Sequence, residues 1–175
     1  MTRIVVCPTE HAVRSCEAFR PSHAVSLAAP GGAVPDLACE NRLVLLFNDI
    51  AEPRPGLAAP CRDDIAALLA FGASWTGAAP LLVHCQVGIS RSTATAFILA
   101  CQREPDRTEI AVAEVLRAAS PCATPNPLMV ALADDLLGRA GRMVDAVRRI
   151  GRGADYRSYE RFELRLAARG PSTPV

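Results

Sequence analysis

A histidine, a cysteine and an arginine lie close together in the segment HCQVGISRST, which spans residues 84–93. Cys85 follows the short apolar run Leu81-Leu82-Val83, which predicts a buried strand, and the residues from Arg91 onward predict a helix. Backbone N–H groups in such a connection lie near the positive end of the helix, where they can bind a tetrahedral anion. The segment therefore predicts a phosphate-binding loop.

The side chains of this loop predict nucleophilic chemistry on the bound phosphate. Cys85 is the candidate nucleophile, because the helix dipole, the loop amides and Arg91 all favour a negative sulfur at neutral pH. The planar guanidinium of Arg91 matches two phosphoryl oxygens, and Gly88 permits the positive φ that a wrapped loop needs. Ser92 would stabilise the sulfur as it departs, and His84 would point into the fold and brace the loop. The candidate phosphate-binding residues are Gln86, Val87, Gly88, Ile89, Ser90 and Arg91.

The segment resembles the signature of the cysteine-dependent protein phosphatases, in which His-Cys is followed by five residues, an arginine and a serine or threonine. The match comprises His84, Cys85, Gly88, Arg91 and Ser92, and Ser90-Arg91-Ser92 agrees with the compact dual-specificity members. The resemblance extends over roughly residues 20–137. It implies a protein tyrosine or dual-specificity phosphatase that acts through a cysteinyl-phosphate intermediate, in an α/β fold with the phosphate-binding loop between a strand and a helix.

A phosphatase of this kind also needs a general acid that protonates the leaving oxygen, which accelerates the reaction by about 10²–10⁴-fold. In the family this acid is an aspartate on a mobile loop after the neighbouring strand. Asp49 lies 36 residues before Cys85 in the segment FNDIAEP, and we assign it as the acid. Two alternatives stay open: Glu52 is a rival acid on the same loop, and Asp49 is also a plausible turn-capping residue among the nearby prolines.

Pro125 and Asn126, before the helical run 128–137, resemble a Pro-Asn step that many dual-specificity phosphatases carry there. A simple helix-initiating turn accounts for the same two residues equally well. No chemical role is assigned to Asn126 from this pattern.

Apolar runs and turn residues alternate along the chain in a strand–helix order. Such alternation indicates an α/β fold with a mainly parallel central sheet flanked by helices. We expect a single domain over residues 1–170 and a loose tail over residues 171–175. The predicted strands cover residues 4–7, 24–27, 43–47 and 81–84. The predicted helices cover residues 63–75, 91–104, 110–119, 128–137 and 143–150, the second with Ala94, Phe97, Ile98 and Cys101 as its buried stripe.

Charge and composition exclude some classes of partner. The net charge of +1 does not predict a nucleic-acid partner, and no apolar stretch is long enough to span a membrane. All 19 basic residues are arginines, which with the abundant alanine suggests a GC-rich bacterial genome. The range 139–169 holds nine arginines and four acidic residues. That basic end either binds an acidic partner or a membrane surface, or forms a solvated helix face, which is the more ordinary interpretation.

Seven cysteines without a CxxC pair, and a short apolar start without a signal-peptide core, predict a reducing, cytoplasmic location. The three histidines at positions 11, 23 and 84 form no ligand pattern, so we expect neither a metal nor another cofactor.

The expected substrate is a phosphorylated protein or a small phosphate ester. A phosphoinositide phosphatase is an alternative, although Gln86, Val87 and Ile89 are neutral where such enzymes usually carry lysines. No tyrosine-bearing loop that would grip a phosphotyrosine ring is found, since Tyr156 and Tyr159 lie near the C-terminal end. Two other classes stay open: a non-catalytic phosphate-binding module, and a sulfurtransferase or arsenate reductase, of which the arsenate reductase would need further redox cysteines nearby. A disulfide between Cys85 and another cysteine is a separate open question of redox control.

Overall fold

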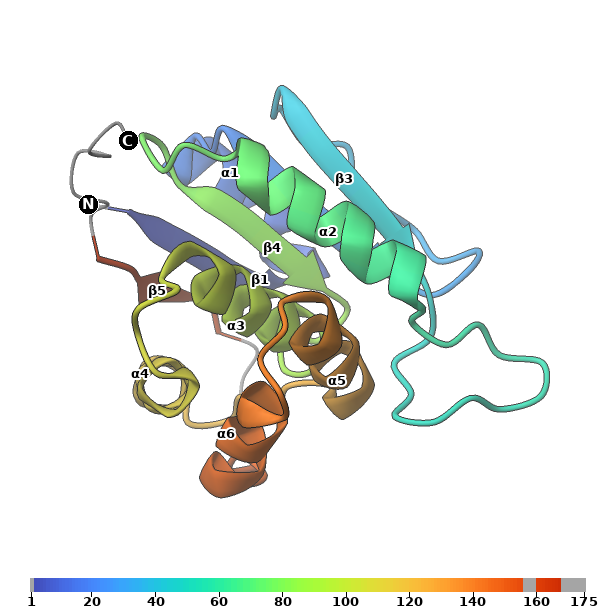
Figure 1. Cartoon of the computed structure of the whole chain (residues 1–175). Coiled ribbons are helices and arrows are strands. Elements are labelled where there is room, and N and C mark those ends of the chain that lie inside the picture. The colour runs from blue at the N-terminus through green and yellow to red at the C-terminus, as the bar shows by residue number, and fades with distance from the viewer. Residues whose placement is uncertain (1, 156–159, 168–175) are drawn as a thin grey trace.

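A computed structural model of the 175-residue chain describes residues 2–155 and 160–167. Its centre is a five-stranded sheet with the order β3-β2-β4-β1-β5 (Figure 1). Four neighbouring strands run parallel, and β5 pairs antiparallel with β1 at one edge. The strands are β1 (Arg3–Pro8), β2 (His23–Ala28), β3 (Asn41–Leu46), β4 (Leu81–Cys85) and β5 (Phe162–Arg165).

The three inner strands β1, β2 and β4 are buried along almost their whole length. A parallel strand covered on both faces reads as a continuous apolar run, which explains why these segments lack alternation. Cys85 lies in register with Pro8 of β1 and Leu27 of β2. The carboxyl ends of the inner strands therefore meet at one edge, where ligands bind in open parallel sheets.

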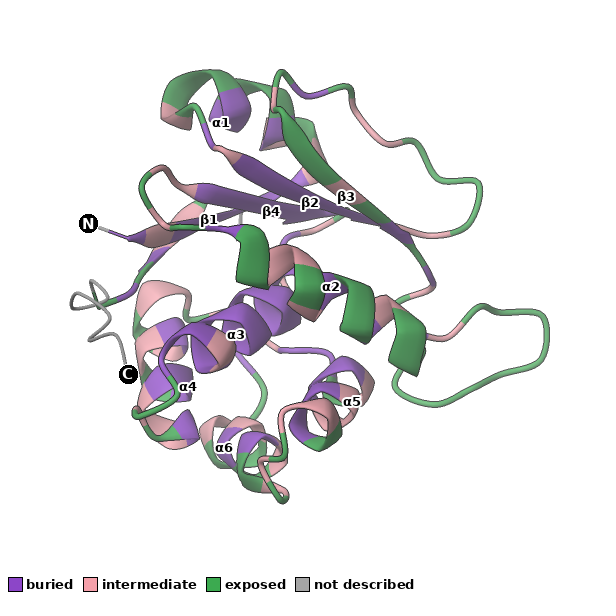
Figure 2. Ribbon diagram, turned by 45° about the horizontal axis from the view of Figure 1, so that its top comes forward, coloured by how far each residue is buried: buried purple, intermediate pink, exposed green. Residues whose placement is uncertain are grey.

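Helices cover the two faces of the sheet unequally. A short 3-10 turn η1 (Thr9–His11) leads into α1 (Ala12–Phe19) on one face, and five helices lie on the other (Figures 1 and 2). The central α3 has 12 of its 13 residues buried, because β4, α2, α4 and α5 pack around it. The five helices are α2 (Arg62–Ser74), α3 (Arg91–Arg103), α4 (Glu109–Ala119), α5 (Pro127–Leu136) and α6 (Arg142–Ile150).

The predicted α/β fold with a mainly parallel sheet is confirmed, and each predicted strand and helix has a counterpart within a few residues. The single buried stripe predicted for α3 is too narrow, since that helix is enclosed on almost every side. Neither α1 nor β5 was predicted. The predicted tail over residues 171–175, together with Tyr156 and Tyr159, lies outside the described residues. Within the described part of the chain, no helix is long and apolar enough to cross a bilayer.

Candidate active site

The segment between β4 and α3 forms a tight loop at the carboxyl edge of the sheet. Gly88, at its centre, has a φ of 82°. A Cβ atom built on Gly88 would lie 3.0 Å from the backbone N of Pro8 and 3.1 Å from the carbonyl carbon of Cys7. Both the positive φ and this close approach require glycine, so the loop wraps directly against the end of β1.

The sulfur of Cys85 lies within the curve of this loop, where it accepts a hydrogen bond from the amide of Gly88 and its thiol donates to the hydroxyl of Ser92. The residue is 2% exposed. Its Sγ lies 3.3 Å from the backbone N of Gly88 and 3.2 Å from the Oγ of Ser92. Once the thiol has lost its proton, the hydroxyl of Ser92 can turn to donate, and hydrogen bonds from an amide and a hydroxyl stabilise a negatively charged sulfur.

The first turn of α3 carries no compensating group of its own. Ser90, at the N-cap position, makes no capping hydrogen bond with its side chain, and the first turn carries no acidic residue. An N-terminus in this state favours an anion, either a thiolate or a phosphoryl group.

Arg91 is a buried cation with an unused donor. The residue is 4% exposed, and its Nη1 donates to the carbonyl oxygen of Phe47 at 2.8 Å. Its Nε is buried without a hydrogen-bond partner and lies 3.9 Å from Oδ2 of Asp49. Because a buried N–H without a hydrogen-bond partner is costly, this donor is available to an anion that enters the loop.

Asp49 lies at the rim of the loop, next to Ser90 and Arg91. Its Oδ1 accepts hydrogen bonds from the Oγ of Ser90 at 2.7 Å and the Nδ2 of Asn126 at 2.8 Å. Directly before it, Asn48 pairs with Ala58 through its backbone N at 2.7 Å and its side-chain Oδ1 at 2.9 Å. This clasp closes the base of the loop that projects from the body in Figure 1, so Asp49 is held at the fixed base.

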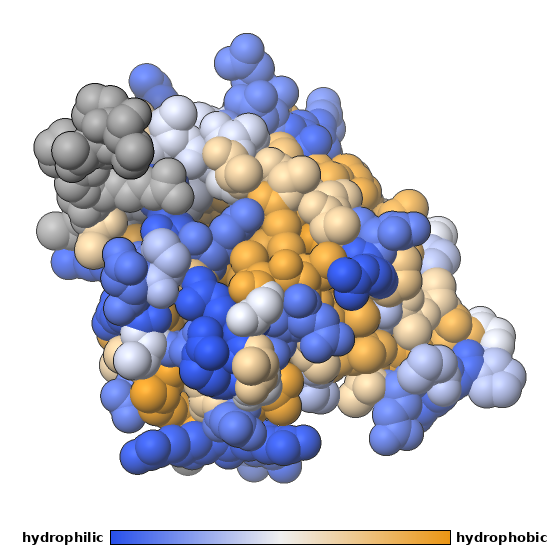
Figure 3. All heavy atoms as spheres, viewed as in Figure 1, coloured by the Kyte–Doolittle hydropathy of each residue, from blue (hydrophilic) through white to orange (hydrophobic). Residues whose placement is uncertain are grey.

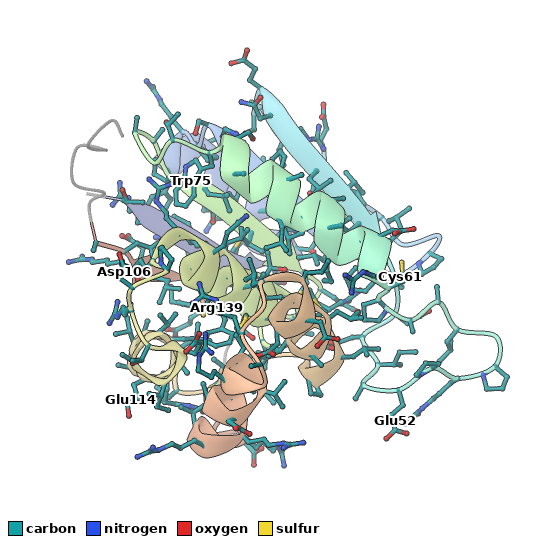
Figure 4. The ribbon with its side chains drawn as sticks, in the orientation of Figure 1. Glu52, Cys61, Trp75, Asp106, Glu114 and Arg139 are labelled. Atoms are coloured by element: carbon teal, nitrogen blue, oxygen red, sulfur yellow. The ribbon has the colours of Figure 1, made fainter. Side chains whose placement is uncertain are left out.

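The rival acid Glu52 lies farther along the same projecting loop. It is exposed, and Figure 4 shows its side chain directed away from the body of the molecule. Of the two candidate acids, the structure therefore brings only Asp49 to the phosphate-binding loop.

Asn126 is a buried residue to which the sequence pattern gave no chemical role. Its Oδ1 accepts from the backbone N–H groups of Leu128 and Met129, both at 3.1 Å, and so caps α5. Its Nδ2 donates to Asp49 and also to the carbonyl oxygen of Ile50 at 3.1 Å. The Asn-Pro sequence predicts the cap, whereas the second set of bonds depends on a segment more than seventy residues away.

His84 lies behind the loop, 1% exposed, in the middle of a polar chain. Its Nε2 lies 2.7 Å from the Oγ of Ser26, and its Nδ1 lies 3.1 Å from the Oγ1 of Thr9. Burial, with a smaller contribution from the charge of Arg42, lowers the pKa of His84 to about 4. The neutral ring thus connects β4 to β2 and to η1.

The remaining loop residues surround Cys85 and are held from outside. The carbonyl oxygens of Ile89 and Ser90 accept from the backbone N–H groups of Thr124 at 3.0 Å and Asn126 at 3.3 Å. The connection between α4 and α5 therefore fixes the outer side of the loop. Gln86 is exposed, and Val87 is partly buried.

The cysteine neighbours of Cys85 are buried and not bonded to it in the structure. All seven cysteines are free thiols. Cys7 is paired with His84 in the sheet and packs in the cluster on the α1 side, whereas Cys85 packs in the cluster on the α3 side. Burial raises the pKa of Cys7 to about 11 and that of Cys101 to about 12, which keeps both protonated. Within the described residues, no three His, Cys, Asp or Glu side chains gather as a metal site would require.

Comparisons with known proteins define the fold. No protein-family model and no curated protein matches the chain. Among solved structures, a variant of human DUSP28 matches with a TM-score of 0.60 at 16% identity, over 78% of this chain and 98% of that one. DUSP15 matches with a TM-score of 0.60 at 18% identity, over 83% and 88%. The Yvh1 phosphatase domain from Chaetomium thermophilum matches with a TM-score of 0.57 at 15% identity, over 82% and 99%.

These matches place the chain in one fold class: it has the fold of the dual-specificity phosphatases. The expectation of fold drawn from the residues 84–92 is thereby confirmed.

Proposed function

We propose that this protein is a cysteine-dependent phosphomonoester hydrolase, acting as a protein tyrosine or dual-specificity phosphatase. The observation that carries the proposal is the buried Nε of Arg91, which has no hydrogen-bond partner, beside a cysteine thiol that accepts from the amide of Gly88 and donates to the hydroxyl of Ser92. A bound phosphoryl group would satisfy that donor and present its phosphorus to the sulfur. The fold shared with dual-specificity phosphatases supports the same reaction.

In the first step, the thiolate of Cys85 attacks phosphorus in line, and the bond to the leaving oxygen breaks. Arg91 and the amides of residues 86–91 stabilise the three equatorial oxygens, on which negative charge must be held through the transition state. Asp49 in its protonated form donates to the departing oxygen. Its Oδ2 is the atom suited to this transfer, because Oδ1 already accepts from Ser90 and Asn126.

In the second step, water hydrolyses the cysteinyl-phosphate. Asp49, now ionised, takes a proton from the attacking water, and the P–S bond breaks as inorganic phosphate forms. Ser92 lies 3.2 Å from the sulfur and donates a hydrogen bond to the departing thiolate. Arg91 and the loop amides hold the phosphoryl oxygens in both steps.

Three alternatives are less well supported. A phosphoinositide phosphatase would hold a polyanionic head group, yet Gln86, Val87 and Ile89 bring no charge to the loop. A non-catalytic phosphate-binding module has no need for an aspartate held by two hydrogen bonds beside the loop. An arsenate reductase lacks support because the side chains of Cys7 and Cys85 pack in separate clusters on opposite faces of the sheet.

The setting of the activity belongs to the same proposal. We propose a single phosphatase domain over residues 1–170, working in a reducing cytoplasm on phosphorylated proteins or small phosphate esters. The seven free thiols support a reducing compartment. Arg139 and Arg142 pair with the buried carboxylate of Glu109. An acidic partner of the arginine-rich range 139–169 would therefore bind other arginines of that range.

The proposal is tested by hydrolysis of a small aryl phosphate with the wild-type chain and Cys85→Ser. We expect turnover by the wild type, none by the serine variant, and competitive inhibition by vanadate. Undiminished turnover by Cys85→Ser would show that another group attacks the phosphate. Cys101→Ser, a change at a buried thiol near the opposite end of α3, serves as the matched control and retains activity.

A further inference from the structure

A groove of about 440 Å³ adjoins the phosphate-binding loop. Three segments line it. These are Ile89 and Ser90 of the loop, Cys122 and Thr124 of the α4–α5 connection, and the range 152–155 after α6. We name it the Ser90 groove, and the reactions proposed above do not use it.

The Ser90 groove has fixed walls. The backbone N of Gly153 donates to Oγ1 of Thr124 at 3.1 Å, and the backbone N of Ala154 donates to the carbonyl oxygen of Pro121 at 3.0 Å. A Cβ atom on Gly153 would collide with the backbone of Cys122, so the two segments touch directly. The backbone N–H of Thr124 also donates to the carbonyl oxygen of Ile89. The wall formed by residues 152–155 is therefore connected through Thr124 to the phosphate-binding loop.

The position of the groove relates it to the leaving group of the substrate. Ser90 lines the groove, and its hydroxyl donates to Asp49 at 2.7 Å. The oxygen that leaves must face Asp49, so the group attached to that oxygen emerges beside Ser90. A volume of this size is typical of sites that bind a ligand much larger than a phosphate ion.

The rim of the Ser90 groove carries an arginine that can exchange its partner. Nη2 of Arg152 lies 2.9 Å from Oδ1 of Asp155, but their side chains are 80% and 89% exposed. Exposed ion pairs contribute little, so another carboxylate competes readily. Arg148 and Arg149 at the end of α6 are also outward, and Figure 3 shows strongly hydrophilic side chains over the surface of α6. Arg148, Arg149 and Arg152 against Asp145 and Asp155 leave this rim with a net charge of +1, which favours an anionic ligand over a cationic one.

We propose that the Ser90 groove binds the polypeptide next to a phosphorylated residue, and that Arg152 selects an acidic side chain in that polypeptide. This inference rests on the proposed function and names its substrate class: phosphoproteins with an acidic residue beside the phosphorylated one. The substrate carboxylate replaces Asp155 as the partner of Arg152.

Two phosphopeptides that differ only in a flanking Glu or Lys, together with a small aryl phosphate, test this assignment. For Arg152→Glu, we expect kcat/KM on the Glu peptide to fall by about fivefold to tenfold, because one exposed ion pair becomes a like-charge pair. For the same variant, kcat/KM on the Lys peptide should rise and kcat/KM on the aryl phosphate should not change. Arg165→Glu, which makes the same charge change near the opposite end of β1, is the matched control and leaves the ratio unchanged.

A second variant tests the groove itself. Ala154→Trp fills the groove and is expected to lower kcat/KM on both peptides while sparing the aryl phosphate, whereas Ala118→Trp, an exposed change on α4, spares all three. Equal effects of Arg152→Glu on the Glu and Lys peptides would overturn the role of Arg152. Unchanged peptide hydrolysis by Ala154→Trp would overturn the assignment of the Ser90 groove as the site that binds the polypeptide.

A binding measurement separates this inference from the proposed function. Fluorescence anisotropy of the two labelled peptides on the Cys85→Ser protein gives Kd values that need no turnover. Tighter binding of the Glu peptide, lost in the Arg152→Glu background, supports the inference even if no hydrolysis is found. Equal Kd values for the two peptides overturn it. Absence of aryl phosphate hydrolysis by the wild type refutes only the proposed function.

Discussion

Replacement of Asp49 by asparagine removes the proposed proton donor while keeping the geometry around it. An asparagine Oδ1 can still accept from Ser90 and Asn126, whose hydrogen bonds to Asp49 measure 2.7 and 2.8 Å. Its Nδ2 then takes the place of Oδ2, 3.9 Å from the Nε of Arg91, and cannot give up a proton to a leaving oxygen. The phosphate-binding donors are untouched, so substrate binding should persist.

The expected loss is the contribution of general acid catalysis, about 10²–10⁴-fold in kcat, which corresponds to about 3–5 kcal/mol of transition-state stabilisation. KM should change little. The loss should be largest for alkyl phosphates, whose leaving oxygen needs a proton most, and smallest for aryl phosphates with acidic phenols. The assay is a series of phosphate esters graded by the acidity of the leaving alcohol, measured for wild type and Asp49→Asn.

Glu52→Gln is the matched control, because it makes the same chemical change on the exposed part of the same loop. It should leave every ester in the series unaffected. A loss with Asp49→Asn that is equal for all leaving groups would refute the acid role and indicate that Asp49 only positions the loop. A large loss with Glu52→Gln and a small one with Asp49→Asn would reverse the assignment.

Three further predictions concern the residues around the loop. Asn126→Ser keeps an oxygen that can cap α5 but removes the amide donor to Asp49, so kcat should fall about tenfold with little change in thermal stability. Asn126→Ala should also cost about 1 kcal/mol in unfolding free energy, because the cap is lost as well. Equal stability of the two variants would contradict this division. Gly88→Ala forces a side chain into a position with positive φ against the end of β1. It should abolish most phosphate hydrolysis and lower the free energy of unfolding, measured by chemical denaturation, by about 1–2 kcal/mol. Full activity would show that the loop conformation is not required. Burial lowers the pKa of His84 from 6.5 to about 4, so between these pH values the unfolded chain binds a proton that the folded chain does not. The free energy of unfolding should therefore fall by roughly 3 kcal/mol as the pH drops from 6.5 to 4. Urea titrations of His84→Gln should show a smaller fall in unfolding free energy over this pH range, and an unchanged fall would assign it to other groups.

The sequence alone predicted the strands and helices that have strong hydrophobic patterns. Buried parallel strands such as β4 read as short apolar runs, and α4 and α5 show apolar periodicity with turn residues at their ends. The strand β5 escaped prediction because its four residues, Phe-Glu-Leu-Arg, are too few to show a period and pair at a sheet edge. The helix α1 escaped prediction because its eight residues are amphipathic but only weakly apolar, and the strongly apolar strand β1 lies just before it in the sequence.

The candidate site could be predicted only as far as its residues are adjacent in sequence. The loop from His84 to Ser92 is local, so spacing alone predicted which side chains share it. Asp49 needed the additional inference that neighbouring strands end at the same edge. The link from Asn126 to Asp49 joins segments 77 positions apart, and the orphaned Nε of Arg91 depends on burial by the whole fold. Neither feature has a signature in the local sequence.

Covalent trapping on Cys85 tests the central claim most directly. Acid quenching of Asp49→Asn during turnover of an aryl phosphate, followed by mass spectrometry of the peptide that contains residues 84–91, should find a phosphoryl group on the sulfur of Cys85. The group should be absent from Cys85→Ser treated in the same way. Continued hydrolysis with no phosphoryl group on Cys85, or with the group on another residue, would contradict the mechanism.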